Sequence, residues 1–225
     1  MPDAPVPPIV IEKKRGKGCW GCGCAVLIVL AVLIVVLAIL GYRAVNTFAR
    51  GFTSTTPAAI PVTDAGDAVE QSAQQKIEDF TQAFEQVQPA TLRLTGDEIN
   101  TLIAREPDYA ALRGKVHVTL QDDTAQIDST LLLGTFEKFF MPDRYLNSVA
   151  TVGVGFNPAT HAIAFDLRQL QMNGQPSPSS ANPVLDQDLN VFVNQQLQSN
   201  QLAKDFLARV QKIDIEDGQL VIEIK

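Results

Sequence analysis

The sequence predicts an α+β protein with one N-terminal transmembrane helix, followed by an antiparallel β-sheet with helices packed on one face. The anchor is indicated by an unbroken apolar run from Ala25 to Leu40, in which every residue is Ala, Val, Ile or Leu. The rest of the chain mixes two patterns. Segments of alternating apolar and polar residues are typical of strands, and segments with apolar residues every three or four positions are typical of helices.

The apolar run fits an uncleaved membrane anchor better than a signal peptide. No charged residue occurs between Lys17 and Arg43. A helix over 23–42 therefore has the roughly 20 residues that cross the hydrocarbon core of a bilayer. A cleaved signal peptide has a shorter apolar region and ends at a small-x-small site, which residues 41–50 do not offer.

The basic residues predict the orientation and the division of the chain. Four of them precede the apolar run and two follow it closely, which favours a cytoplasmic N-terminus in a single-pass protein of the cell membrane. The sequence thus predicts four parts, which are a cytoplasmic tail (1–22), a transmembrane helix (23–42), a linker (43–66) and an extracytoplasmic α+β domain (67–225).

The charge is distributed unevenly along the chain. Residues 1–24 carry a net charge of +2 and the whole chain carries −7, so residues 25–225 carry −9. A basic tail suits the anionic inner leaflet of the bilayer. An acidic external domain lacks the basic face that nucleic acids require, which excludes a nucleic-acid partner.

The cysteines gather just before the apolar run. Cys19, Cys22 and Cys24 supply three sulfurs without a nearby histidine, whereas structural zinc takes four ligands. A lipoprotein cysteine would follow the apolar run, but reversible acylation and redox or metal sensing remain open alternatives. We favour no special role for them. The external domain has no cysteine, so no disulfide stabilises it.

The external domain opens with helical signals. Apolar residues at spacings of three and four predict a helix from about 67 to 87, with a stripe formed by Val69, Ala73, Ile77, Phe80, Phe84 and Val87. A short strand over 91–95 then leads to a second helix that ends before Pro107. Thr95 and Glu98 match a capping box at its start. Asp97 and Glu98 are therefore read as helix-start residues rather than as a catalytic acid pair.

Two hairpins follow. Alternation over 116–131, with a turn at 122–124, places Val116 and Val118 on the apolar face and His117 on the solvent face. A second alternating pair, 150–156 and 161–169, turns at 157–160, so His161 closes that hairpin. Glycines in the fragment "GVGF" indicate a bulge or a close neighbour. One-sided alternation of this kind is typical of an antiparallel sheet with one covered face.

The C-terminal third returns to helices and ends in a hairpin. Asn182 and Pro183 favour a helix start, and the buried face of this helix is predicted to be Leu185, Leu189, Phe192, Val193 and Leu197. A second short helix is expected to place Leu202, Phe206 and Val210 together. The closing hairpin turns at Asp217–Gly218.

The sequence carries no recognisable catalytic motif. No residue is assigned as catalytic, cofactor-binding or metal-binding, so we expect no enzyme and no cofactor. The apolar cluster Phe136, Phe139, Phe140 and Met141 is expected to plug one end of the core. The alternative is a groove or a surface that dips into the membrane.

The stretches "LRLTGDEINTLIA" and "RYLN…VGVGF…IAFDLRQLQMNGQPSP" resemble those of poorly characterised bacterial envelope proteins with a cytoplasmic tail, one anchor and an external α+β domain. The layout is also similar to lipid-binding domains in which a curved antiparallel sheet wraps a long helix. The resemblance covers residues 67–225 and implies binding or scaffolding at the envelope.

These observations predict a membrane-anchored binding or scaffolding domain whose partner is a lipid ligand or an envelope protein. An apolar groove between the sheet and helix 67–87 would support a lipid, and a filled interface there would favour a protein. The alternatives are an envelope hydrolase, which requires a cleft with converging histidine and carboxylate side chains, and sensing through Cys19, Cys22 and Cys24.

Overall fold

The computed structural model describes residues 53–133, 144–177 and 182–225. The predicted tail, the transmembrane helix 23–42, the three cysteines and the cluster from Phe136 to Met141 lie outside these residues. Within the described ranges, no helix is both long enough and apolar enough to cross a bilayer.

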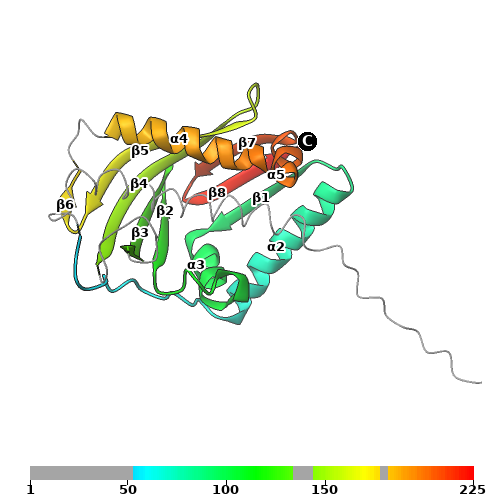
Figure 1. The fold of residues 1–225 in the computed structure, drawn as a ribbon. Coiled ribbons are helices and arrows are strands. Elements are labelled where there is room, and N and C mark those ends of the chain that lie inside the picture. The colour runs from blue at the N-terminus through cyan, green and yellow to red at the C-terminus, as the bar shows by residue number, and fades with distance from the viewer. Residues whose placement is uncertain (1–52, 134–143, 178–181) are drawn as a thin grey trace, which may run out of the picture.

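The described chain is α+β (Figure 1). Its helices are α2 (Asp67–Glu85), α3 (Gly96–Arg105), the short 3-10 helix η1 (Pro107–Tyr109), α4 (Asn182–Ser199) and α5 (Gln201–Leu207). Its strands are β1 (Ala90–Thr95), β2 (Val116–Gln121), β3 (Thr124–Leu132), β4 (Tyr145–Asn157), β5 (Ala162–Met172), β6 (Gln175–Pro176), β7 (Val210–Glu216) and β8 (Gln219–Ile224).

The strands form two antiparallel sheets, so the prediction of a single sheet is wrong. One has the order β1-β8-β7 and the other β2-β3-β4-β5-β6. The division arises because β1 pairs along its whole length with the last strand, from Ala90 opposite Ile224 to Thr95 opposite Gln219. The predicted closing hairpin, β7–β8, thus becomes a three-stranded sheet by pairing with β1, which lies far upstream in the sequence.

Both sheets contribute to one buried core, and β7 packs against β4 where the sheets meet. The alternation predicted for the hairpins is confirmed, since Val116, Val118, Ile127, Ile163 and Phe165 are all buried. Helix α4 lies along β5, and α2 and α3 lie near β1 (Figure 1).

The interface of α2 is filled by aromatic side chains. Phe80 is only 3% exposed, and the rings of Phe80 and Phe84 lie 6.4 and 5.8 Å from the ring of Phe206 on α5. The guanidinium of Arg209 lies 4.4 Å above the ring of Phe84. These contacts join the two helices through a packed cluster.

Two residues of the predicted apolar stripes are exposed, and those assignments are wrong. Val87 is 73% exposed because α2 ends at Glu85 and the chain leaves the helix with a positive φ of 57° at Val87. Leu202 is 55% exposed because it lies in the first turn of α5, next to its N-cap Asn200. The side chain of Asn200 accepts hydrogen bonds from the first turn, which fixes where the helix begins.

The predicted local signals are confirmed. The Thr95 hydroxyl accepts a hydrogen bond from the Glu98 N–H at 3.2 Å, and the Glu98 carboxylate accepts one from the Thr95 N–H at 2.9 Å. Asp217 and Gly218 have φ of 50° and 70°, as a two-residue hairpin turn requires. A bulge between Thr151 and Val152 lies beside the "GVGF" stretch.

Candidate functional site

The segment 53–66, here called the strap, is held against the five-stranded sheet at its start and middle and against α3 at its end. This part of the predicted linker therefore belongs to the folded domain. At its start, Ser54 and Tyr145 exchange backbone hydrogen bonds of 2.9 and 2.7 Å. Arg144 donates to the hydroxyl and the carbonyl oxygen of Thr53, at 2.5 and 2.9 Å.

Asn147 on β4 ties the middle of the strap to the sheet. Its Oδ1 accepts hydrogen bonds from the Ala58 N–H at 2.9 Å and the Thr130 hydroxyl at 2.7 Å. Its Nδ2 donates to the Thr56 carbonyl oxygen at 3.1 Å. One side chain thus satisfies two backbone groups of a segment that has no strand partner there.

The end of the strap is fixed by side chains of α3. The Ala65 N–H donates to the Thr101 hydroxyl at 3.1 Å, and Arg105 pairs with Asp64 at 2.8 Å. Arg105 also pairs with Asp67 and Glu70 on α2. The hydrogen bond from Arg105 holds the pKa of Asp64 below its ordinary value, and the acceptors Asp64, Asp67 and Glu70 raise the pKa of Arg105.

Between these anchors the strap arches over a cavity of about 370 Å³, here called the strap cleft. The residues Ala58–Pro61 form its roof. Its remaining lining comes from three strands and the β5–β6 turn, namely Asp128, Ser129, Asn147, Ser148, Val149, Gln171, Asn173 and Gly174. The cleft volume is at the lower end of the range typical of small-molecule sites.

The floor of the strap cleft is a row of three side chains across β3, β4 and β5. Asp128 lies opposite Val149, and Val149 lies opposite Gln171. Neighbouring strands are ~4.8 Å apart, so the carboxylate and the amide originate about 10 Å from each other, with an isopropyl group between them. The buried hydroxyls of Ser129 and Ser148 are hydrogen-bonded to one another at 2.7 Å.

His117 on β2 lies at the edge of this region, and its prediction as a solvent-facing residue is wrong. Its side chain is only 18% exposed, because the strap covers it. Its Nε2 lies 3.1 Å from the Thr63 hydroxyl and 3.4 Å from Asn100 Nδ2. Its buried Nδ1 lies 4.0 Å from Asp128 Oδ2 and has no hydrogen-bond partner among the described residues.

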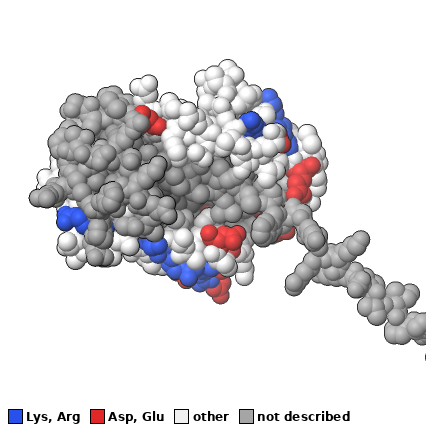
Figure 2. Space-filling model, viewed as in Figure 1, with Lys and Arg blue, Asp and Glu red and all other residues white. Residues whose placement is uncertain are grey.

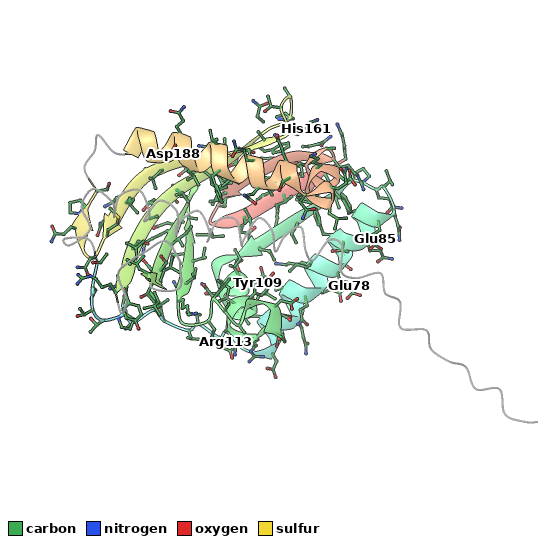
Figure 3. The ribbon with its side chains drawn as sticks, viewed as in Figure 1. Glu78, Glu85, Tyr109, Arg113, His161 and Asp188 are labelled. Carbon is green, nitrogen blue, oxygen red and sulfur yellow. The ribbon has the colours of Figure 1, made fainter. Side chains whose placement is uncertain are left out.

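His161 is placed as predicted, at the tip of the β4–β5 hairpin (Figure 3). It takes a positive φ of 50° in the turn, and its Nδ1 lies 3.2 Å from the Leu207 carbonyl oxygen at the end of α5. His161 thus contacts α5, whereas His117 contacts the strap.

Glu98 has the structural role predicted for it. Burial raises the pKa of its carboxyl, but hydrogen bonds from Lys76, the Thr95 N–H and Ser72, with the charge of Lys76, outweigh burial and lower the pKa overall. Within the described ranges, no three His, Cys, Asp or Glu side chains gather as metal ligands would. Acidic and basic side chains lie intermingled on the face shown in Figure 2.

Comparisons with protein-family models, with curated proteins and with solved structures found no match to this chain. The strap cleft was not found by sequence reasoning, because Ala58–Pro61 reads as linker and Asp128 as one polar position of a strand. A signal was nevertheless present in Asn147, a polar side chain with the capacity to hold a segment that lacks a partner strand.

Proposed function

We propose that this chain is a single-pass membrane protein whose extracytoplasmic domain binds a ligand or partner and has no catalytic activity. The strap cleft is the observation that carries the proposal. It is a formed concavity with a small set of polar groups on a rigid sheet, the arrangement typical of ligand sites.

The position of the strap supports a role close to the bilayer. The predicted anchor ends at residue 42 and the described strap begins at Thr53. The ten residues between them span at most about 35 Å when fully extended. With that anchor, the start of the strap at Thr53 stays within that reach of the membrane surface, and the cleft begins five residues further along the chain, at Ala58.

The chemistry of the cleft favours a polar ligand or a protein partner over a lipid chain. A lipid would be favoured by an open apolar groove under α2, but Phe80, Phe84 and Phe206 fill the part of that interface that is described. The strap cleft instead combines an apolar roof, Ala58–Pro61, with a floor that carries the Asp128 carboxylate and the Gln171 amide on either side of Val149.

Native mass spectrometry of the full chain, extracted from its membrane in mild detergent, tests this proposal. The variant Val149→Trp fills the cleft floor. Thr151→Trp is its matched control, because it places the same side chain two residues along the same face of β4, outside the cleft lining. We expect a non-covalent adduct on the wild type and the control that is missing from Val149→Trp.

An adduct that persists in Val149→Trp would place binding elsewhere, and no adduct on any of the three proteins would contradict a stable ligand. A mass that identifies the adduct as a phospholipid would restore the lipid hypothesis.

A hydrolase is the second candidate, because the structure brings a hydroxyl, a histidine and a carboxylate together in Thr63, His117 and Asp128. A hydroxyl nucleophile needs such a base and an orienting acid. The 4.0 Å from His117 to Asp128 exceeds hydrogen-bond length, so the histidine is not oriented by the acid. Ester hydrolysis by the full chain that is lost in both Thr63→Val and His117→Gln would favour this candidate.

A further inference from the structure

We infer that the strap cleft selects an aliphatic primary ammonium group that carries an amide or similar hydrogen-bonding group about 10 Å away. This inference rests on the proposed binding function and specifies its ligand. It follows from the order of the side chains along the cleft floor, which runs from a carboxylate to an isopropyl group and then to an amide.

The carboxylate of Asp128 is the point that selects a cation. Among the described residues that line the cleft, it carries the one charge. Its side chain is 25% exposed, and one donor, the Gln126 amide on the same strand, lies 3.2 Å from its Oδ1 and 3.5 Å from its Oδ2. A carboxylate retains acceptor capacity after one such bond.

Several other carboxylates of the domain are already paired with a cation. Asp64, Glu98, Asp123 and Glu216 each contact a lysine or arginine side chain. Within the described part of the chain, no lysine or arginine lies within 4.0 Å of Asp128. The imidazole Nδ1 of His117 lies 4.0 Å from Asp128 Oδ2, which is beyond hydrogen-bond length. A carboxylate in a covered cleft, without a lysine or arginine partner, favours a cationic ligand over a neutral one.

The rest of the floor sets the shape of the ligand. Val149 lies beside Asp128 under the apolar roof of Ile60 and Pro61, which suits a short methylene chain. Gln171 lies beyond it on β5, opposite Val149, and contributes its amide to the floor, and Asn173 also lines the cleft. The amide of Asn147, in contrast, is already used by the strap.

Two sources supply this chemistry, a free aminoalkyl compound and a lysine side chain of a partner polypeptide. The test therefore uses 6-aminohexanamide as the free probe and a blocked Gly-Lys-Gly tripeptide as the polypeptide probe. Tighter binding of the first assigns the site to a free compound, and tighter binding of the second assigns it to a polypeptide.

Calorimetric titration of the full chain in nanodiscs compares 6-aminohexanamide with 6-hydroxyhexanamide, which has the same length but no charge. We expect the amine to bind at least about tenfold more tightly than the alcohol, since a hydrogen bond between charged groups is stronger than one between neutral groups. Asp128→Asn should abolish that preference. The control Asp108→Asn changes an exposed carboxylate on η1 and should leave it intact.

Three results would overturn the inference. They are equal affinity for 6-aminohexanamide and 6-hydroxyhexanamide, no binding of either compound, and an unchanged preference for the amine in Asp128→Asn. If Asp128→Asn does not fold, Val149→Trp serves as the second variant and must block binding of the amine. The two proposals can fail separately. If mass spectrometry finds an adduct that is lost in Val149→Trp, but calorimetry finds no preference for the amine, the proposed binding function stands and only the proposed ligand class is wrong.

Discussion

The side-chain amide of Asn100 pairs with the backbone of Val118 at both of its polar atoms. Nδ2 donates to the Val118 carbonyl oxygen at 2.7 Å, and Oδ1 accepts from the Val118 N–H at 2.9 Å. Asn190 and Asn194 on α4 do the same for Phe165 and Ile163 on β5. These helix side-chain amides thus bond the backbone groups of β2 and β5 that could otherwise pair with another strand. This arrangement protects the strand edges.

We predict that Asn100→Leu destabilises the domain by about 2–4 kcal/mol, because it leaves two buried backbone groups of Val118 without partners. Urea unfolding of the full chain in detergent measures this. The control Gln195→Leu changes an exposed position of α4 and should stay within about 0.5 kcal/mol of the wild type. Equal effects of the two substitutions would contradict the role of Asn100.

Glu98 should make stability depend on pH. Its pKa is lower in the folded state, so its contribution is present above the unfolded value of about 4.3 and is lost as pH falls through the folded value. We expect Glu98→Gln to be less stable by about 1–2 kcal/mol at pH 7 and to lose less stability on acidification.

Unfolding curves at pH 7 and below pH 4 for the wild type and Glu98→Gln measure this dependence. Glu78→Gln is the control, because Glu78 projects from the exposed side of α2 (Figure 3). Parallel pH profiles for the wild type and Glu98→Gln would show that another carboxyl dominates in acid.

The packing of α2 gives a third prediction. Phe80→Ala should cost about 3–5 kcal/mol, because it removes a buried ring from the contact with Phe206. Val87→Ala, at an exposed position, should change stability by less than about 0.5 kcal/mol. A small effect of Phe80→Ala in the same unfolding measurement would indicate a loose, groove-like interface under α2.

The proposed orientation is testable with the native cysteines. The chain has three cysteines, of which Cys19 and Cys22 precede the predicted anchor 23–42 and Cys24 lies at its cytoplasmic end. A membrane-impermeant maleimide should therefore label the protein only after intact cells are opened. Asp108→Cys, on exposed η1, should be labelled in intact cells. Labelling of the wild type before the cells are opened would reverse the topology.

Local sequence signals predicted most of the fold. The capping box of Thr95 and Glu98, the Asp217–Gly218 turn and the buried alternation of both middle hairpins depend on neighbours within a few residues. The second sheet was missed because it requires Ala90 to meet Ile224, a pairing that no local pattern specifies. The strap cleft was missed for the same reason, since Ala58 meets Asn147 only in the folded domain.

The central claim is that the strap cleft binds a ligand at the membrane. Its most direct test is amide hydrogen exchange of the full chain in vesicles from its own membrane, compared with the chain in vesicles of purified phospholipid. The account predicts slower exchange at residues 58–60 and 171–174 in the native vesicles and no change in α2. Unchanged exchange in those two segments, or slower exchange confined to α2, would contradict it.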